Sequence, residues 1–203
     1  MLHPDQDREP AGVRQTQSRT DPRIERSRLV IRQAALDELG AAGYGAFAIE
    51  SVATRAGVAK STIYRHWPDK LALIADALET FHKQAVPDIQ GVSPRERVQL
   101  LVHHVAQVLV DSTFSACIPA LIEGAERDPR VREFHHRYSA DRRQSLIDVI
   151  AEGVAAGDFP ARLDPELAAL ALLGPIFYSR LMSGRSFDPE RARDLVDLVL
   201  GSR

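Results

Sequence analysis

The sequence predicts an all-α protein of about nine helices, and two observations carry this prediction. A short polar residue followed by proline is the pattern of a capped helix start, because proline suits the first helical position and the side chain accepts a backbone N–H. Apolar residues recur at the 3.6-residue helical period, and no stretch shows the alternation of a strand. The capped starts are Asp21-Pro22, Ser93-Pro94, Asp128-Pro129, Asp164-Pro165 and Asp188-Pro189.

Three helices are predicted in the first third of the chain. In the first, Ile31, Ala35 and Leu39 repeat at helical spacing, and Gly43 stands where that helix should end. The second repeats small and apolar residues in the same way, and the third ends at a Trp-Pro step. The predicted bounds are 22–42, 49–56 and 60–66, preceded by a flexible basic arm at 1–20.

Longer helices are predicted in the remainder of the chain. Ser93, with Glu96 three residues later, has the spacing of a capping box, which marks one helix start. Gly91, Gly157 and Gly184 stand where helices should stop. The predicted bounds are 68–84, 94–112, 117–126, 129–156, 164–182 and 189–200.

Composition excludes several classes of protein. The 203 residues are enough for one cored domain, or for a small module joined to a larger one. The single cysteine, Cys117, rules out a disulfide framework. The longest dense apolar run, 167–177, is too short to span a membrane, and the first twenty residues lack the apolar core of a secretory signal. We therefore expect a cytoplasmic protein with no membrane partner.

Charge is distributed unevenly along the chain. The net formal charge of −2 by itself argues against nucleic acid as a partner. Residues 13–70 nevertheless hold 10 basic and 6 acidic side chains, whereas residues 71–203 hold 15 basic and 19 acidic ones. A basic N-terminal part on an acidic body is typical of a nucleic-acid footprint. An ordinary solvated face would show the same charges, so charge alone leaves both interpretations open.

The spacing of small and apolar residues between 49 and 67 favours a helix-turn-helix. Ala53 is small enough for a second helix to cross the first closely, and Gly57 suits a turn that requires positive φ. Val58 and Ile63 would then anchor the second helix and turn its polar side chains outward, as insertion into a major groove requires. Spacing alone also fits a plain helical hairpin with a polar face.

The same region resembles a known family. The segment from Gly57-Val58 to Ile63-Tyr64-Arg65-His66-Trp67-Pro68-Asp69-Lys70 is similar to the DNA-binding domain of TetR-family transcriptional regulators, and the resemblance runs over roughly residues 22–84. It implies a helix-turn-helix domain at 21–68 and a larger effector-binding and dimerisation domain at 69–203. This second domain resembles the family only in helix count and layout.

The resemblance implies roles for individual residues of the helix at 60–66. Its first residues match base-reading positions, Tyr64 and His66 match phosphate-holding positions, and Arg65 either pairs with guanine or clamps a phosphate. Lys70 matches a phosphate contact at the next helix start, where the helix dipole also attracts anions. The predicted DNA-binding residues are Lys60, Ser61, Thr62, Tyr64, Arg65, His66 and Lys70.

Two positions depart from the family pattern. Ala48 and Ala59 stand where the family commonly has a hydroxyl residue that caps the helix, and losing such a cap costs about 1 kcal/mol. We therefore expect softer helix ends there. The arginines near the N-terminus fit either a DNA-contacting arm or a solubilising one, and they are Arg14, Arg19, Arg23, Arg26 and Arg28.

The last two helices are predicted to form a homodimer interface. A helical DNA reader needs two copies to span two half-sites. Residues 163–182 are apolar nearly all round, which implies burial on more than one side. The family resemblance implies that these helices pair with their mates in a four-helix bundle. Packing within one chain is the alternative explanation of the same pattern.

The middle helices carry polar and aromatic residues on otherwise apolar faces, which predicts a cavity for an effector. Each such residue also fits core packing or surface exposure. No cofactor or metal site is predicted, because adjacent histidines on a helix point about 100° apart and no zinc-ligand spacing is present. The candidate ligand-binding residues are His104, Gln107, Phe114, Cys117, Tyr138, Phe177 and Tyr178.

Together these features predict a ligand-released repressor that binds a palindromic operator on double-stranded DNA as a homodimer, with an unidentified small-molecule effector. A transcriptional activator with the same fold is one alternative, and a helical ligand-binding protein that no longer uses DNA is another. An enzyme is not predicted, because the sequence has no phosphate-binding loop, nucleophile elbow or paired-carboxylate signature.

Overall fold

A computed structural model of the chain describes residues 22–85, 91–110 and 113–202. Within these ranges it contains nine α-helices, one short 3-10 helix and no strand, which confirms the predicted all-α class. The helices are α1 (Pro22–Ala46), α2 (Ile49–Ala56), α3 (Lys60–His66), α4 (Lys70–Ala85), α5 (Pro94–Val110), α6 (Thr113–Arg127), α7 (Pro129–Ala156), α8 (Pro165–Met182), η1 (Pro189–Arg191) and α9 (Ala192–Leu200).

The capped helix starts form as the sequence predicts. The carboxylates of Asp128, Asp164 and Asp188 each accept a hydrogen bond from the backbone N–H two residues later. Ser93 and Glu96 form the capping box at the start of α5. The Glu96 carboxylate accepts the Ser93 backbone N–H at 3.1 Å, and the Ser93 hydroxyl accepts the Glu96 N–H at 3.3 Å.

α4 begins later than predicted, at Lys70 and not at Pro68. Trp67 has an extended backbone with φ −131° and ψ 118°, so the chain does not turn directly from α3 into the next helix. Asp69 supplies the cap of α4, because its Oδ1 accepts the backbone N–H of Ala72 at 2.9 Å. The capping aspartate, and not the proline, therefore sets where α4 starts.

The start of α6 also differs from the prediction, and α1 is bent near its end. α6 begins at Thr113 and not at Cys117, whose thiol donates to the Thr113 carbonyl at 3.2 Å within the first turn. α1 runs on to Ala46 across a kink at Gly43, where φ is 77° and the backbone is left-handed. The regular helix therefore ends at Gly43 as predicted, and a short helical segment follows the kink up to Ala46.

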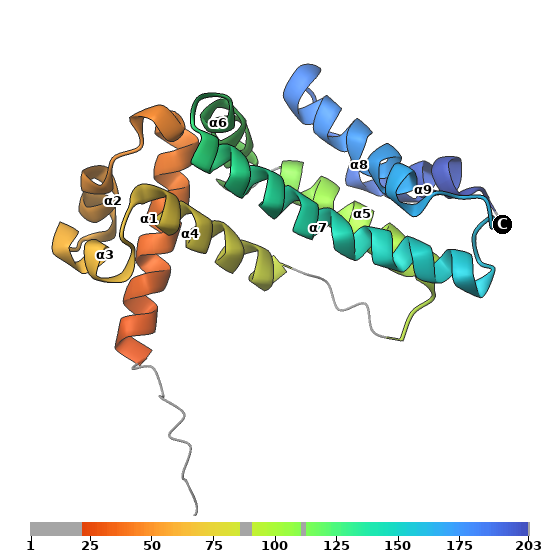
Figure 1. The fold of residues 1–203 in the computed structure, drawn as a ribbon, viewed down its shortest axis with the longest axis horizontal. Coiled ribbons are helices and arrows are strands. Elements are labelled where there is room, and N and C mark those ends of the chain that lie inside the picture. The colour runs from red at the N-terminus through yellow and green to blue at the C-terminus, as the bar shows by residue number, and fades with distance from the viewer. Residues whose placement is uncertain (1–21, 86–90, 111–112, 203) are drawn as a thin grey trace, which may run out of the picture.

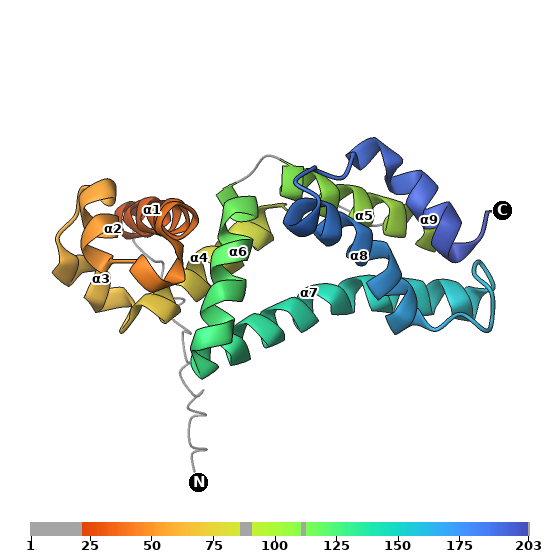
Figure 2. The same ribbon diagram turned by 90° about the horizontal axis from the view of Figure 1, so that it is seen from above.

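The molecule is elongated, with the short helices at one end (Figure 1). α2 and α3 lie beside α1 at that end, whereas α8 and α9 lie at the other, and α4 and α6 lie between the two ends. α7, the longest of the described helices, runs from the C-terminal end of α6 to the far end of the molecule (Figure 2).

Two buried clusters of apolar side chains hold this arrangement. The first contains side chains of α1, α2, α3, α4, α6 and the start of α7. It includes Ile31, Ile63 and Ile74. The second joins α5, α7, α8 and α9, and it includes Ile150 and Leu172. Because Ile74 belongs to the first cluster, the helix-turn-helix and α4 share one core.

α1 and α6 approach each other closely. A Cβ added at Gly40 of α1 would lie 2.9 Å from the Cβ of Ala116, and one added at Gly124 of α6 would lie 2.9 Å from the ring of Tyr44. Both distances are too short for a side chain, so only glycine allows the contact. α1, which leads into the helix-turn-helix, is therefore fixed against α6.

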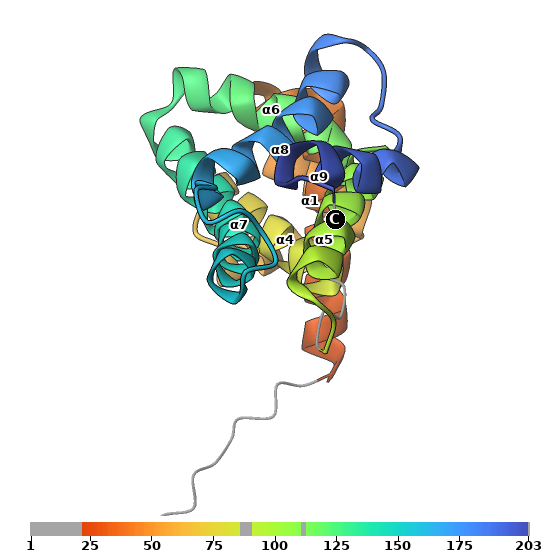
Figure 3. The ribbon, with the colours of Figure 1, turned by 90° about the vertical axis from the view of Figure 1, so that its right-hand side faces the viewer.

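α8 and α9 form the outer layer at the far end of the molecule. Seen from that end, they lie over α5 and α7, and the chain ends beside α9 (Figure 3). None of the described helices alone is long and apolar enough to cross a membrane, and α5 and α6 meet that test only as a pair, across a bend of 84°.

Candidate nucleic-acid interface and ligand cavity

The turn between α2 and α3 is built on a glycine. Gly57 has φ 66° and ψ 34°, a left-handed conformation that other residues rarely adopt. Its N–H donates to the Thr54 carbonyl at 3.2 Å, and the N–H of Val58 donates to the Ala53 carbonyl at 3.0 Å. These bonds end α2 abruptly, so that α3 begins only three residues after Gly57.

Neither short helix has a side-chain cap at its start. Ala48 and Ala59 occupy the cap positions with extended backbone, and neither side chain makes a capping hydrogen bond. α2 and α3 depend instead on the burial of Val52 and Ile63, both of which are fully enclosed. The cap hydrogen bond that a hydroxyl residue would supply is therefore absent at both positions, and the softer helix ends expected there stay a prediction.

One face of α3 is buried and the rest is exposed. Ile63 is fully buried and Trp67 follows it into the core, which fixes the rotation of α3 about its axis. Thr62 is half-buried and the Tyr64 side chain is 52% exposed. The other predicted DNA-binding residues of α3 are Lys60, Ser61, Arg65 and His66, all of them exposed. The structure therefore presents most of the predicted hydrogen-bond donors to solvent at the end of the molecule.

Lys60 is engaged in an ion pair at the protein surface. Its Nζ lies 2.8 Å from the Glu50 carboxylate of α2, and both side chains are exposed. The hydrogen bond between them lowers the pKa of Glu50 and raises that of Lys60. In the free protein, Glu50 thus neutralises a predicted base-reading residue.

Lys70 lies half-buried at the first position of α4. Its Nζ donates to the Tyr44 backbone carbonyl at 2.9 Å and lies 4.2 Å from the centroid of the Tyr44 ring. These contacts hold the start of α4 against the end of α1. The phosphate contact that the resemblance implies for Lys70 requires its ammonium to share these partners or to leave them.

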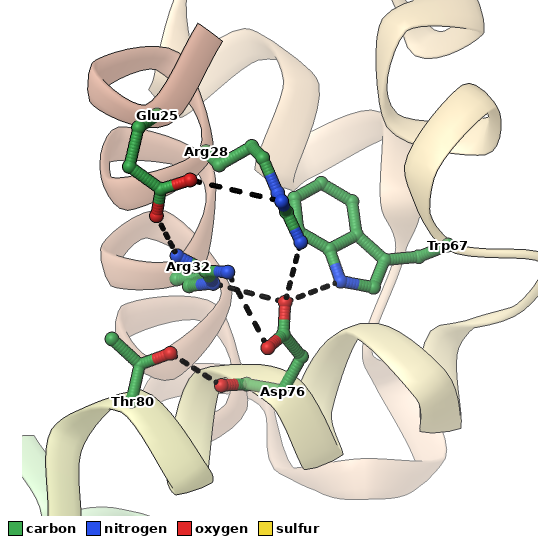
Figure 4. Close-up of polar contacts among 6 residues, drawn as sticks. All are labelled: Glu25, Arg28, Arg32, Trp67, Asp76 and Thr80. Carbon is green, nitrogen blue, oxygen red and sulfur yellow. Dashed lines mark hydrogen bonds and ion pairs between the residues drawn. The ribbon is translucent and has the colours of Figure 1, made fainter. Parts of the chain in front are cut away.

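A cluster of polar contacts ties α3 to α1 and α4 (Figure 4). Asp76 of α4 accepts hydrogen bonds from the Trp67 indole N–H at 2.8 Å and from Arg32 Nε of α1 at 2.9 Å. Arg32 also donates to Glu25 at 2.9 Å, and the Arg28 guanidinium lies 5.8 Å from the centroid of the Trp67 ring. One carboxylate therefore joins the three helices that position the recognition surface.

The described part of the chain includes three of the five N-terminal arginines. Residues 1–21, which include Arg14, Arg19 and the predicted cap Asp21, lie outside the described residues. Of the arginines nearby, Arg23 and Arg26 are both exposed in the first turns of α1. Arg28 is half-buried and pairs with Glu25 at 3.7 Å and with Asp76 at 3.8 Å. Arg28 is thus occupied by carboxylates in the free protein.

A second feature is a cavity of about 450 Å³ in the other half of the molecule. It is enclosed by α5, α6, α7 and α8, and its walls are predominantly aliphatic and aromatic. Its size lies within the range of small-molecule sites in proteins. Four of the predicted ligand-binding residues line it, and they are His104, Phe114, Tyr138 and Phe177.

The other three predicted ligand-binding residues lie outside this cavity. Gln107 is exposed on α5, and Tyr178 is 65% exposed on α8. Cys117 is fully buried but points toward α1, where its thiol donates to the Leu36 carbonyl at 3.3 Å. Helical periodicity marks a residue as buried without showing which neighbouring helix it faces.

The sequence reasoning missed two arginines in the cavity wall. Arg142 and Arg143 of α7 both line the cavity, and the Arg142 guanidinium lies 4.7 Å from the centroid of the Tyr138 ring. The spacing of four residues between Tyr138 and Arg142 places them on one face of a helix, a signal that was available in the sequence. Arg142 also pairs with Glu79 of α4 at 2.5 Å.

Burial disfavours the charged form of two histidines in the cavity wall, His104 and His135. Burial lowers the pKa of His104, and the neighbouring His103 lowers it further. Burial, with a contribution from His136, does the same for His135. Across the part of the chain that the structure describes, no three His, Cys, Asp or Glu side chains are grouped as metal ligands.

Two family models match the chain. The model of the bacterial regulatory proteins of the tetR family matches residues 31–77, and that of the tetracyclin repressor-like C-terminal domain matches residues 89–199. The chain belongs to the TetR family. The first match contains α2 and α3, and the second contains all four helices that enclose the cavity.

Relatives of this TetR-family chain are bacterial transcriptional regulators. The HTH-type regulator YdeS of Bacillus subtilis is 30% identical over 178 residues, which are 86% of this chain and 88% of YdeS. The DNA-binding transcriptional repressor TetR of Mycobacteroides abscessus is 30% identical over 167 residues, covering 78% and 83% of the two chains.

Solved structures share the fold of this TetR-family chain. GusR of Salmonella enterica has a TM-score of 0.72 at 21% identity, covering 91% of this chain and 99% of GusR. FadR of Bacillus subtilis, solved in complex with stearoyl-CoA, has a TM-score of 0.70 at 20% identity, covering 86% and 99%. The protein is therefore a DNA-binding, helix-turn-helix transcriptional regulator of the TetR family.

Proposed function

We propose that this regulator is a repressor that binds a palindromic operator as a homodimer and is released by a small molecule. The observation that carries the proposal is the exposed, donor-rich surface of α3, whose rotation is fixed by the burial of Ile63 and Trp67. A recognition helix needs such a rigid setting, because each base contact depends on its placement.

The proposed docking places the N-terminal end of α3 in the major groove. Lys60, Ser61 and Thr62 then reach base edges, while Tyr64 and His66 hold the backbone phosphates on either side. Arg65 pairs with a guanine or clamps a phosphate, and Lys70 contacts a phosphate from the start of α4. Lys60 must exchange Glu50 for DNA when it docks, because the two are paired in the free protein.

The proposed homodimer uses an apolar stripe on α8. Leu167, Leu170, Tyr178 and Met182 are exposed and lie three to eight residues apart on one side of that helix, and Leu198 of α9 is 81% exposed. A contiguous exposed apolar stripe on a water-facing helix marks an interaction surface. A second copy of the chain covers it through a two-fold axis, which also gives the two recognition helices that a palindrome requires.

The proposed effector binds in the cavity between α5, α6, α7 and α8. FadR of Bacillus subtilis, which has the same fold, holds stearoyl-CoA, and this supports a small-molecule ligand for the present chain. In this proposal, the domain at 21–68 binds DNA, and the domain at 69–203 binds the effector and the second copy of the chain. Ligand binding then shifts the dimer toward a geometry in which the two copies of α3 no longer match two half-sites.

The proposal is tested by selection from a pool of random double-stranded DNA with the full chain. We expect enrichment of an inverted repeat whose half-sites lie about one helical turn apart, or a multiple of it. A Tyr64→Ala variant should bind the selected site and its sequence variants more weakly by a similar factor, because a phosphate contact is lost. Selection that enriches no inverted repeat would refute the proposal.

A further inference from the structure

The charge of the cavity wall is of one sign. Two arginines, Arg142 and Arg143, line the cavity, and none of the described aspartates and glutamates does. His104 and His135 add no positive charge near neutral pH, because burial lowers their pKa values. The remaining wall is largely apolar, with residues such as Val105, Leu121 and Phe177. Such a wall complements an apolar molecule that carries a negative charge.

Both arginines have hydrogen-bonding capacity that the protein leaves unused. The Nε atoms of Arg142 and Arg143 are enclosed and have no hydrogen-bond partner among the described residues. Arg142 donates to Glu79 through a different nitrogen, Nη2, at 2.5 Å. Enclosed donors without partners carry a desolvation cost, which a ligand that accepts hydrogen bonds removes.

We propose that the effector is an apolar monocarboxylate whose carboxylate binds Arg142 and Arg143 and displaces Glu79 from Arg142. The proposal rests on the effector site argued above and adds the chemical class of its ligand and the contact that the ligand changes. A carboxylate matches the planar fork of a guanidinium and binds it through two parallel hydrogen bonds. The apolar part of the ligand is removed from water by the aliphatic wall.

Displacement of Glu79 connects the cavity to α4. Glu79 lies on α4 and Arg142 on α7, so their ion pair fastens one helix to the other. A second ion pair joins Asp69, the cap residue just before α4, to Arg130 of α7 at 2.7 Å. A ligand that takes Arg142 therefore removes one attachment of the C-terminal half of α4 to α7 and leaves the ion pair at its start in place.

The first experiment measures ligand binding by isothermal titration calorimetry with the full chain and without DNA. The probes are straight-chain fatty acids from hexanoate to hexadecanoate, each compared with the primary alcohol and the primary amine of the same length. We expect at least one acid to bind about tenfold or more tightly than its alcohol, as for a charge-assisted hydrogen bond, and the amine to bind more weakly still. Equal affinity for acid and alcohol overturns the proposal, as does a series in which no acid binds.

The second experiment tests the two partners of Arg142 with the acid that binds best. Arg142→Gln should weaken binding about tenfold or more, whereas Arg142→Lys, which keeps the charge, should lose less. Glu79→Gln should strengthen binding several-fold, because the ligand no longer competes with a carboxylate for the guanidinium. Unchanged or weaker binding by Glu79→Gln overturns the displacement, and this variant gives an answer even if Arg142→Gln fails to fold.

A matched control comes from another ion pair on α7. The Glu152 carboxylate accepts a hydrogen bond from the Arg97 guanidinium of α5 at 2.7 Å, and neither residue lines the cavity. Glu152→Gln makes the same chemical change as Glu79→Gln on a pair that the ligand does not touch, so ligand affinity should not change. An equal gain of affinity in both variants would show a general charge effect and would overturn the displacement.

Failure of this inference is distinguishable from failure of the proposed function. Because the ligand titrations contain no DNA, they test the carboxylate site whatever the protein does on DNA. If an acid binds at Arg142 but leaves operator affinity unchanged, the ligand class stands and release by ligand is wrong. If the operator is selected as expected but no acid binds, the regulator stands and the carboxylate site is wrong.

Discussion

The indole N–H of Trp67 donates to the carboxylate of Asp76 at 2.8 Å. Trp67 follows the last residue of α3, and Asp76 lies in the middle of α4, so this bond joins the recognition helix to the helix that leads into the rest of the molecule. Arg32 of α1 donates to the same carboxylate at 2.9 Å. The setting of α3 therefore depends on one acidic side chain.

Replacing Asp76 by alanine should destabilise the protein by about 2 kcal/mol, because Arg32 is largely buried and would keep only Glu25 as a partner. We expect a fall in the thermal midpoint of several degrees, measured by circular dichroism. Thr80→Val is the matched control, since the Thr80 hydroxyl bonds only the Asp76 backbone carbonyl. A loss as large in the control as in Asp76→Ala would contradict the role of the carboxylate.

Replacing Glu50 by glutamine should strengthen DNA binding about two- to fivefold at low salt. The change frees Lys60 from its ion pair and removes a negative charge beside the recognition helix. Fluorescence anisotropy over a range of KCl concentrations should show a salt dependence that is steeper by about one counterion.

The control for this prediction is Glu152→Gln, which changes the net charge equally but lies near the end of α7, far from α3 (Figure 1). DNA affinity should stay the same in this variant. If Glu50→Gln binds DNA no better than the native chain, the ion pair with Glu50 does not limit the contact of Lys60 with DNA, and the prediction is wrong.

Cys117 should be inert in the folded protein. Burial raises the pKa of its thiol to about 12, with a further contribution from Asp37. Iodoacetamide at pH 8 should therefore modify the unfolded chain in guanidinium but leave the native chain unmodified, as read by mass spectrometry. Because this is the only cysteine, each modification event is unambiguous. Equal rates in the two states would contradict the buried position.

The same raised pKa gives a pH dependence of stability. The unfolded thiol ionises near its ordinary pKa of 9.0, whereas the folded thiol stays protonated up to about 12. The stabilising contribution is thus complete below pH 9 and is lost as pH rises from 9 to 12. In a Cys117→Ala variant, the free energy of unfolding should therefore fall less between pH 9 and pH 12 than in the native chain. Denaturant titrations across that range measure this difference.

The helical framework of this protein follows from local sequence signals. The carboxylates of Asp128, Asp164 and Asp188 cap their helices as the Asp-Pro pairs predict, and Gly57 forms the turn of the helix-turn-helix. These signals are local, since a cap or a left-handed residue acts within one turn of the chain. The start of α4 was misplaced because Pro68 and Asp69 offer competing start signals, and the side-chain cap prevailed.

The cavity was harder to predict, because its composition depends on contacts between helices. Cys117 and Phe114 lie on the same helix, yet Cys117 faces α1 while Phe114 faces the cavity. The rotation of a helix against its neighbours is set by the whole core and not by its own period. The sequence does not predict Arg142 in the cavity wall, because arginine is usually exposed and its partner Glu79 lies 63 residues away.

α4 connects the two functional regions through residues three apart. Asp76 faces α1 and Trp67, and Glu79, one turn later, faces Arg142 of α7. A movement of α4 that breaks the second contact therefore acts on the helix that carries the first. This proximity gives the proposed release a physical route from the cavity to the recognition helix.

The central claim is that α3 reads base edges in each half-site of an operator, and one measurement tests it most directly. Each base pair of the selected half-site is substituted in turn, symmetrically in both halves, and the dissociation constant is measured for the native chain and for Lys60→Ala. The native chain should lose about 1–3 kcal/mol of binding free energy at each contacted base pair. We predict that Lys60→Ala no longer discriminates at one position of each half-site but keeps its preference at the others. An identical pattern of preference in the two proteins would contradict the claim.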